Sequence, residues 1–499
     1  MGTCYLFSTG MAGGRLERPG LVERVRRLLV LPTIVFAQFA GTSLWFAPNA
    51  ILPLVRFTSD GRPARRGGAA ELALLTSLVQ AGYVVGTLVL AYLAVADRLQ
   101  AERVFAVACA LGALTNGLCA TTTRLASWAA LRLCVGVCLA GIYPVGMKVA
   151  ARQFPQGLGG RMGVIIGGLV FGTAFPWLLA LLGGRLPYEQ LLAAVSALAA
   201  LGGLLLALVV GAGPVRVRPT PAAPAPLRAG EERAADALAG AASAAAHAAV
   251  APAAFGVASL RAIWASRQFR AAACGYFGHM WELYGFWVFV PELVRAHAAS
   301  RGASGGLSVE LASFVAIAVG APASALVGVW SLYAALPLRA SAGNGRVVAP
   351  ATAGAPGGTE GGAKGSDAKA IPGSAVVAMG SLLLSGLCCL LAPLSTRMST
   401  GAFATLLVVW GSAVVADSGQ FSALCAKGAP SELVGTALTL TTCAGFALTI
   451  ASIQMVGAML GAGVDAGLAM LALTPGPACG LAAAYVEWPL HRAVCARPR

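Results

Sequence analysis

The chain has 499 residues, of which 58% are hydrophobic and only 11% are charged, and its formal net charge is +16. Soluble domains hold about half apolar and about a quarter charged residues, so this composition excludes an ordinary soluble protein and indicates an integral membrane protein. The basic residues are spread over many loops and form no dense patch with interleaved aromatic residues, which argues against a nucleic-acid partner.

Twelve long apolar stretches follow one another along the chain. A bilayer core needs roughly 20 apolar residues per helix, and continuous apolar runs favour helices over a membrane barrel, whose strands alternate apolar and polar residues. The predicted spans are Leu31–Val55, Leu72–Ala96, Val104–Ala120, Leu125–Ala151, Met162–Leu182, Leu191–Val210, Phe269–Val294, Leu311–Leu338, Ala375–Leu394, Gly401–Ala426, Leu433–Gly461 and Ala466–Val486. The predicted fold class is therefore an all-α membrane protein.

A polar, Ala- and Pro-rich segment at 211–267 divides these spans six and six, which predicts two six-helix halves joined by a linker. The predicted parts are an N-terminal segment (1–30), a first bundle (31–210), the linker, a second bundle (268–487) and a tail (488–499). A Gly-rich stretch at 341–373 predicts a flexible insertion within the second bundle. Composition favours plain tethers for both polar segments, and a regulatory role stays open.

Most Lys and Arg residues lie in loops on the same side of the predicted membrane as the N-terminus. The positive-inside rule therefore places both termini in the cytoplasm, and we expect the plasma membrane. The first outer loop opposes this trend with four arginines, at positions 56, 62, 65 and 66.

The twelve cysteines are scattered without the paired Cys and His spacing of a zinc site. No nucleophile, phosphate-binding or metalloprotease motif is present either. We therefore expect no metal, no cofactor and no enzymatic activity.

The seventh span carries the densest group of polar residues. His279 and Glu282 lie three residues apart and share one helix face, with Tyr284 among the aromatic residues around them. An ionisable residue inside a bilayer costs at least about 2.5 kcal/mol, so each is a functional hypothesis. A buried carboxylate and a histidine can exchange a proton near neutral pH, which predicts a proton-coupling or substrate-binding pair. The alternative is a structural hydrogen bond to a neighbouring helix.

Two further charged residues lie within predicted spans. Arg132 in the fourth span should face a cavity, where it could bind an anion or affect Glu282, or else form a permanent ion pair. Asp417 in the tenth span, next to Gln420, is a second candidate for a proton or cation site, or a simple hydrogen-bonding group.

The first span presents a polar stripe. Gln38, Thr42, Trp45 and Asn49 recur at spacings of four, three and four, which places them on one helix face, and Pro48 can loosen the helix there. The stripe predicts cavity lining; polar contacts between helices are the alternative.

Several segments carry a family resemblance. Asp97, Arg98 and Arg103 resemble the loop motif that braces the cytoplasmic gate of the major facilitator superfamily, and Arg132 resembles its helix-four motif linked to proton coupling. Four stretches are similar to a group of bacterial-type facilitator permeases: 39–53, 141–148, 275–287 and 414–440. The resemblance implies two six-helix bundles around a central cavity. This chain departs from the loop motif at position 93, where it has Leu and the family usually has Gly. Nitrate permeases resemble one another in carrying one arginine in span two and another in span eight. Neither span has an arginine here, which argues against nitrate as the substrate.

Together, the residues and the resemblance predict a monomeric secondary active transporter that moves a small organic solute by alternating access. We expect this transport to be coupled to protons. Two alternatives stay open: a uniporter in which the same groups only bind substrate, and a transport-derived receptor.

Overall fold

A computed structural model describes residues 21–59, 62–154, 158–183, 186–211, 256–302, 306–333 and 373–487. The predicted tail lies wholly outside the described residues. The N-terminal segment, the linker and the insertion lie largely outside them.

Ten of the predicted spans coincide with helices that are long and apolar enough to cross a membrane. Of the other two, the first contributes a shorter apolar helix, Leu28–Thr42, and the seventh lies in a 35-residue helix rich in polar residues. In the first half, the helices are α1 (Leu21–Thr42), α2 (Ala69–Tyr92), α3 (Val95–Arg98), α4 (Ala101–Leu118), α5 (Leu125–Ala140), α6 (Tyr143–Gln153), α7 (Leu158–Gly183) and α8 (Tyr188–Val209). In the second half, they are α10 (Val257–Ala265), α11 (Arg267–Arg301), α12 (Val309–Ala318), α13 (Gly320–Tyr333), α14 (Gly373–Leu391), α15 (Thr400–Ala416), α16 (Ser418–Gly428), α17 (Val434–Gly461), α18 (Ala466–Leu471) and α19 (Pro475–Glu487).

Several spans that the sequence predicts as continuous helices are interrupted. Helix α1 ends at Thr42, and the chain continues as turns to the short 3-10 helix Leu52–Leu54, so the prediction of one helix to Val55 is wrong in its second half. The fourth span breaks between α5 and α6, and the tenth breaks at Asp417 between α15 and α16. Prolines lie at two of the breaks, since Pro48 lies in the turns after α1 and Pro144 is the second residue of α6.

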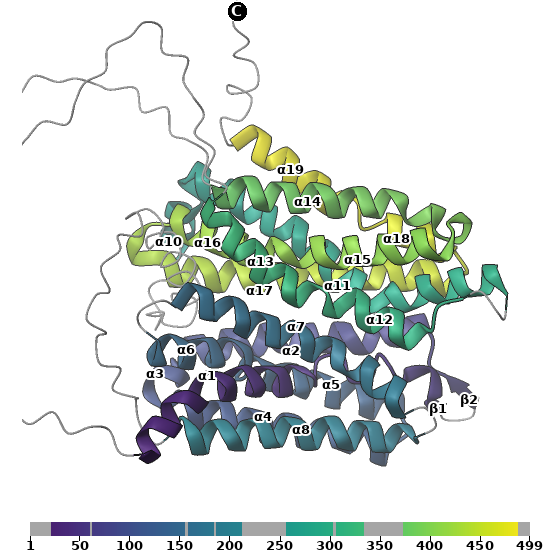
Figure 1. Cartoon of the computed structure of the whole chain (residues 1–499), viewed down its shortest axis with the longest axis horizontal. Helices are drawn as coiled ribbons and strands as arrows, with labels where there is room; N and C mark the ends of the chain where they lie inside the picture. Colours follow the sequence, from purple (N-terminus) through teal and green to yellow (C-terminus); the bar gives the residue numbers. More distant parts are fainter. Residues whose placement is uncertain are drawn as a thin grey trace, which may run out of the picture.

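Helices from the same half of the chain lie together. Figure 1 shows α1–α8 in the lower part and α11–α19 in the upper part, with their axes roughly parallel. The most extensive contacts between these parts are those of α2 with α17 and of α7 with α12 and α13. Within the first half, α2 and α5 cross closely because Gly82 and Gly136 face the partner backbone. A Cβ atom on Gly136 would lie 2.1 Å from the carbonyl oxygen of Val79.

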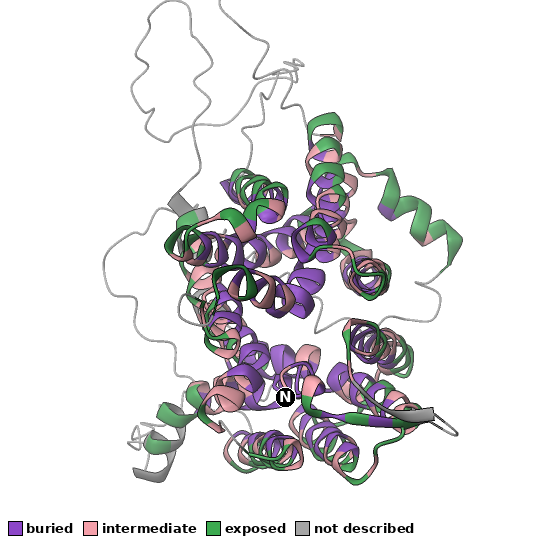
Figure 2. Ribbon diagram, turned by 90° about the vertical axis from the view of Figure 1, so that its right-hand side faces the viewer, coloured by how far each residue is buried: buried purple, intermediate pink, exposed green. Residues whose placement is uncertain are grey.

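The side chains divide into a buried interior and an apolar outer surface. Figure 2 shows buried residues where the helices face one another and exposed residues on their outer sides. Many of the exposed side chains are large and apolar, including Leu114, Leu204 and Leu384. An apolar outer surface over long helices is what contact with lipid tails requires.

A short hairpin that the sequence analysis did not predict lies at one end of the molecule. Strands β1 (Arg56–Ser59) and β2 (Arg62–Arg66) pair antiparallel, with Arg56 opposite Arg66. Figure 1 shows this hairpin at the right-hand end, whereas α3 and α10 lie at the opposite end. We therefore call this end of the molecule the hairpin end.

Candidate functional site

The side chain of Arg132 holds the interrupted first span. Arg132 lies on α5 and is 1% exposed. Its Nη2 donates to the carbonyl oxygens of Leu44 at 3.1 Å and Trp45 at 2.6 Å, and its Nη1 donates to Oδ1 of Asn116 at 3.2 Å. Because α1 ends at Thr42, these two carbonyls lie outside its regular helix. The guanidinium satisfies them and thereby fixes the chain between α1 and α2.

This buried cation has no anionic partner in the part of the chain that the structure describes. The ion pairs there join other residues, and all three groups that accept from Arg132 are uncharged oxygens. The permanent ion pair that the sequence left open is therefore not found among the described residues. A guanidinium that keeps its charge in an apolar interior remains a strong attractant for an anion.

The polar residues of the first span contact neighbouring helices. Nε2 of Gln38 donates to the carbonyl oxygen of Tyr143 at 3.0 Å, and Nε1 of Trp45 donates to Oε1 of Gln80 at 2.9 Å. Asn49 accepts a longer bond from Thr76, at 3.5 Å. The structure thus favours polar contacts between helices for this stripe. Trp45 and Asn49 follow the end of α1, so the predicted single helix face does not extend to them.

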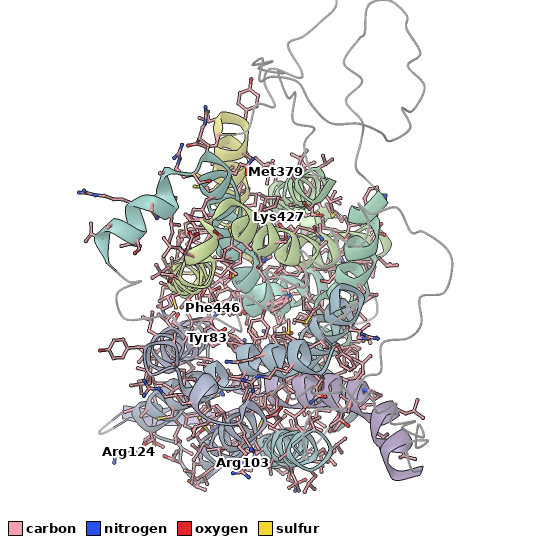
Figure 3. All side chains as sticks on the ribbon, turned by 90° about the vertical axis from the view of Figure 1, so that its left-hand side faces the viewer. Tyr83, Arg103, Arg124, Met379, Lys427 and Phe446 are labelled. Atoms are coloured by element: carbon pink, nitrogen blue, oxygen red, sulfur yellow. The ribbon has the colours of Figure 1, made fainter. Side chains whose placement is uncertain are left out.

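An aromatic layer forms where the two halves meet. The first half supplies Trp45 and Tyr83, and the second supplies Tyr284 and Phe446. The rings of Tyr83 and Phe446 lie 4.3 Å apart between centroids, and Trp45 stacks on Phe446 at 5.5 Å. Figure 3 shows Tyr83 and Phe446 side by side between the two sets of helices. We name these four residues the aromatic layer.

Glu282 lies within the second half and is fully buried on α11. Its carboxylate accepts from Ser385 Oγ at 2.8 Å, from Trp410 Nε1 at 2.7 Å and from the Cys389 thiol at 3.3 Å. These donors come from α14 and α15, so Glu282 fastens α11 to both helices. His279 is not among its hydrogen-bond partners, although the two residues are one turn apart.

His279 instead meets Asp417. Its Nδ1 lies 2.7 Å from Oδ1 of Asp417, and both side chains are fully buried. The two atoms are close but are not aligned for a hydrogen bond, and neither Nε2 of His279 nor Oδ2 of Asp417 has a partner among the described residues. Asp417 stands at the break between α15 and α16, and the nearby side chain of Gln420 is 2% exposed. The structure therefore brings together two residues that the sequence analysis treated separately.

The predicted gate residues lie at the end opposite the hairpin. Arg98 belongs to the short helix α3, Arg103 lies in the first turn of α4, and both are exposed. The side chain of Asp97 lies outside the described part, so its bracing role stays a prediction. Ala94 just before α3 has a φ of 50°, a left-handed conformation that suits Gly better than Ala.

Some residues of the site were missed by the sequence analysis. Gln80, Asn116 and Ser385 are buried polar side chains inside apolar helices that hold Trp45, Arg132 and Glu282 respectively. Their polarity within apolar spans was a usable signal for Gln80 and Asn116. Phe446 carried no such signal, because phenylalanine is ordinary in a membrane span.

A comparison with protein-family models finds no match for this chain. A gallate transporter of Pseudomonas putida is 32% identical over 204 residues, which cover 37% of this chain and 42% of that protein. The chain thus matches less than half of the length of this relative.

The crystal structure of the human organic anion transporter MFSD10 (TETRAN) resembles the whole fold. The TM-score is 0.54 at 15% identity, and the match covers 94% of this chain and 100% of that one. At this identity the likeness concerns the fold. The chain is therefore a multi-pass membrane protein with the fold of this transporter, and ten of its described helices are long and apolar enough to cross a membrane.

Proposed function

We propose that the protein is a secondary active transporter of small organic anions, and of aromatic carboxylates in particular. The observation that carries this proposal is the position of Arg132: it holds the main chain of Trp45, whose ring belongs to the aromatic layer between the halves. The cation thus contacts the main chain of a residue whose ring lies where both halves meet. An aromatic ring bearing a carboxylate matches this combination.

The uncharged partners of Arg132 support an anionic substrate. Carbonyl and amide oxygens leave the guanidinium charge uncompensated, whereas a carboxylate would compensate it through charge-assisted hydrogen bonds. The names of the two similar proteins, a gallate transporter and an organic anion transporter, agree with this substrate class. Nothing comparable favours a cation.

Alternating access between two six-helix bundles is the mechanism that we propose for this fold. Binding sites in such transporters lie near the bilayer midplane and use interrupted helices. Here each half has an interrupted span: the first is interrupted after Thr42, where Trp45 of the aromatic layer lies, and the tenth is interrupted at Asp417. A substrate carboxylate that takes hydrogen bonds from Arg132 would release the carbonyls of Leu44 and Trp45. The first span could then move relative to α5.

We further propose that transport is coupled to protons through the second half. The His279–Asp417 pair supports this role better than Glu282, because the pair has unpartnered polar atoms whereas three donors already occupy the Glu282 carboxylate. Glu282 is kept as a second proton site. Protonation of the acids would lower the negative charge of the second half as an anion enters.

A uniporter is the second candidate function. The three hydrogen bonds that fasten Glu282 to α14 and α15 favour it, since they give that residue a sufficient structural role. We also propose the plasma membrane, cytoplasmic termini and a monomer, as the charge distribution and the fold resemblance imply. A transport-derived receptor is the remaining alternative.

Uptake of radiolabelled gallate into cells tests the proposal. Wild type should accumulate gallate and be inhibited by benzoate, and not by the neutral benzamide. An inward proton gradient should stimulate uptake by wild type. Asp417→Asn should abolish this stimulation, and Glu282→Gln should weaken it. Both variants should still exchange external gallate for internal gallate. Stimulation that survives in both variants would favour the uniporter. Equal inhibition by benzamide would contradict an anionic substrate.

A further inference from the structure

Asn116 is a buried amide that contacts both Arg132 and the neighbouring helix α8. It lies on α4 and is 0% exposed. Its Oδ1 accepts from Nη1 of Arg132 at 3.2 Å. Its Nδ2 donates to Oγ of Ser196 at 3.0 Å and to the carbonyl oxygen of Leu192 at 3.4 Å. The side chain therefore joins α4, α5 and α8 at one point in the interior of the first half.

The partners of Asn116 fix the orientation of its amide. An arginine side chain only donates hydrogen bonds, and a main-chain carbonyl only accepts them. The amide oxygen must therefore face Arg132 and the amide nitrogen must face Leu192, because a flipped amide would set two donors against each other at one end and two acceptors at the other. Asn116 thus presents a neutral oxygen to the guanidinium in one defined orientation.

A carboxylate of the same size at position 116 would form an ion pair. It has an oxygen where asparagine has Nδ2, so it would keep the contact with Arg132 and add a negative charge to it. Its second oxygen could still accept from Ser196, but it would face the carbonyl oxygen of Leu192, which is also an acceptor. The carbonyl of Leu192 therefore favours the neutral amide over a carboxylate.

No charged group compensates Arg132 among the described residues. The titratable side chain there that acts on it electrostatically is the thiol of Cys119, one turn beyond Asn116, and a thiol is largely uncharged at neutral pH. Attraction between charges is several times stronger in an apolar interior than in water. The oxygen that Asn116 offers to Arg132 therefore decides how much positive charge is left for an anion.

We propose that Asn116 determines the preference of the transporter for anions, because it holds Arg132 in place without neutralising its charge. This inference rests on the proposed function and assigns the selection of substrate charge to a residue of α4. Asn116 acts through Arg132, so it is a positioning residue and needs no contact with the substrate itself.

Inhibition of radiolabelled gallate uptake separates charge from structure. Asn116→Asp replaces one NH₂ group by an oxygen, whereas Asn116→Leu removes both polar atoms and adds no charge. In wild type, benzoate should inhibit at a much lower concentration than the neutral benzamide. Asn116→Asp should reduce this preference about tenfold and raise the KM for gallate by a similar factor, as expected when a hydrogen bond to a charged group is weakened. Asn116→Leu should keep the preference, because Arg132 stays uncompensated.

Stability and a matched variant provide the controls. The melting midpoint in detergent should fall for Asn116→Leu, which leaves Arg132 and Leu192 without their partner, and should stay closer to wild type for Asn116→Asp. A merely structural residue would show the larger loss of preference in the variant with the lower midpoint. Gln190→Glu adds a carboxylate at an exposed position of α8 and should leave the preference and the KM unchanged.

A second variant carries the test where Asn116→Asp does not reach the cell surface. Cys119→Asp brings a carboxylate close to Arg132 without changing Asn116, and Cys119→Ser is its neutral control. The first should reduce the preference for benzoate over benzamide, and the second should keep it.

The outcomes distinguish this inference from the proposed function. A wild type that prefers benzoate, together with an unchanged preference in Asn116→Asp at equal surface level, would overturn the role of Asn116 and leave the anion transporter intact. An equal loss of preference in Asn116→Leu would also overturn it, because that variant adds no charge. A wild type that takes up no gallate, or that benzamide inhibits as well as benzoate does, would overturn the proposed function, and the role of Asn116 with it.

Discussion

Replacement of Arg132 by glutamine should destabilise the first half. The guanidinium satisfies two main-chain carbonyls, those of Leu44 and Trp45, and one side-chain oxygen of Asn116. A buried polar group left without a partner costs about 1–3 kcal/mol, so the two carbonyls together account for about 2–6 kcal/mol. Removal of a buried charge offsets part of this loss. We expect the free energy of unfolding to fall by about 2–4 kcal/mol in total.

Thermal unfolding of the purified protein in detergent, followed by tryptophan fluorescence, measures this effect. At about 2–4 °C per kcal/mol for a unit of this size, the midpoint should fall by about 4–12 °C. Arg132→Lys keeps the charge, but one ammonium cannot reproduce the planar fork, so its midpoint should lie between those of wild type and Arg132→Gln. Arg103→Gln, an exposed change on α4, is the matched control. A midpoint of Arg132→Gln within 1 °C of wild type would refute the bracing role of this side chain.

Three further changes have distinct expected results. Gly136→Ala should sharply reduce the folded yield in detergent, because the new Cβ would lie 2.1 Å from the carbonyl oxygen of Val79. Gly401→Ala is the control, since a Cβ there has no neighbour within 4 Å and should leave the yield unchanged. Equal yields of the two variants would contradict the close crossing of α2 and α5. Ala94→Gly should raise stability by about 0.5–1 kcal/mol because φ is 50° there, and a lower midpoint would contradict this. Tyr83→Phe should leave the melting midpoint unchanged, since the Tyr83 hydroxyl has no partner among the described residues. The same change should raise the KM for gallate uptake. An unchanged KM would show that the Tyr83 hydroxyl does not contact the substrate.

The apolar runs were sufficient to predict ten helices because the bilayer length and the need to satisfy backbone groups leave few alternatives. They could not predict the interruptions. The run Leu31–Val55 is largely apolar, but the partner that satisfies its freed carbonyls is Arg132, almost ninety residues further along the chain. The break at Asp417 was equally hidden. The hairpin was missed because arginines are not typical strand formers.

The sequence analysis proposed Glu282, His279 and Asp417 as site residues, but it did not predict which partners they contact. Glu282 and His279 share a helix face, and that spacing led to their prediction as a pair. In the structure, Glu282 is held by Ser385 and Trp410, whereas His279 meets Asp417. Helix periodicity fixes which residues share a face, but the choice of partner depends on which neighbouring helix lies against it. That information is in the packing of α14, α15 and α16.

Buried ionisable groups of opposite charge lie in different halves of the chain, and this separation bears on how a proton and an anion could be coupled. The first half buries the cation Arg132 against the main chain of Trp45, and the second half buries the carboxyl groups of Glu282 and Asp417. An anion bound at Arg132 is attracted by the first half and repelled by any ionised acid of the second. Protonation of those acids removes the repulsion, so it would favour the state in which both halves close on the substrate. Coupling between proton and anion would then need no direct contact between the two, only their shared presence between the same two halves.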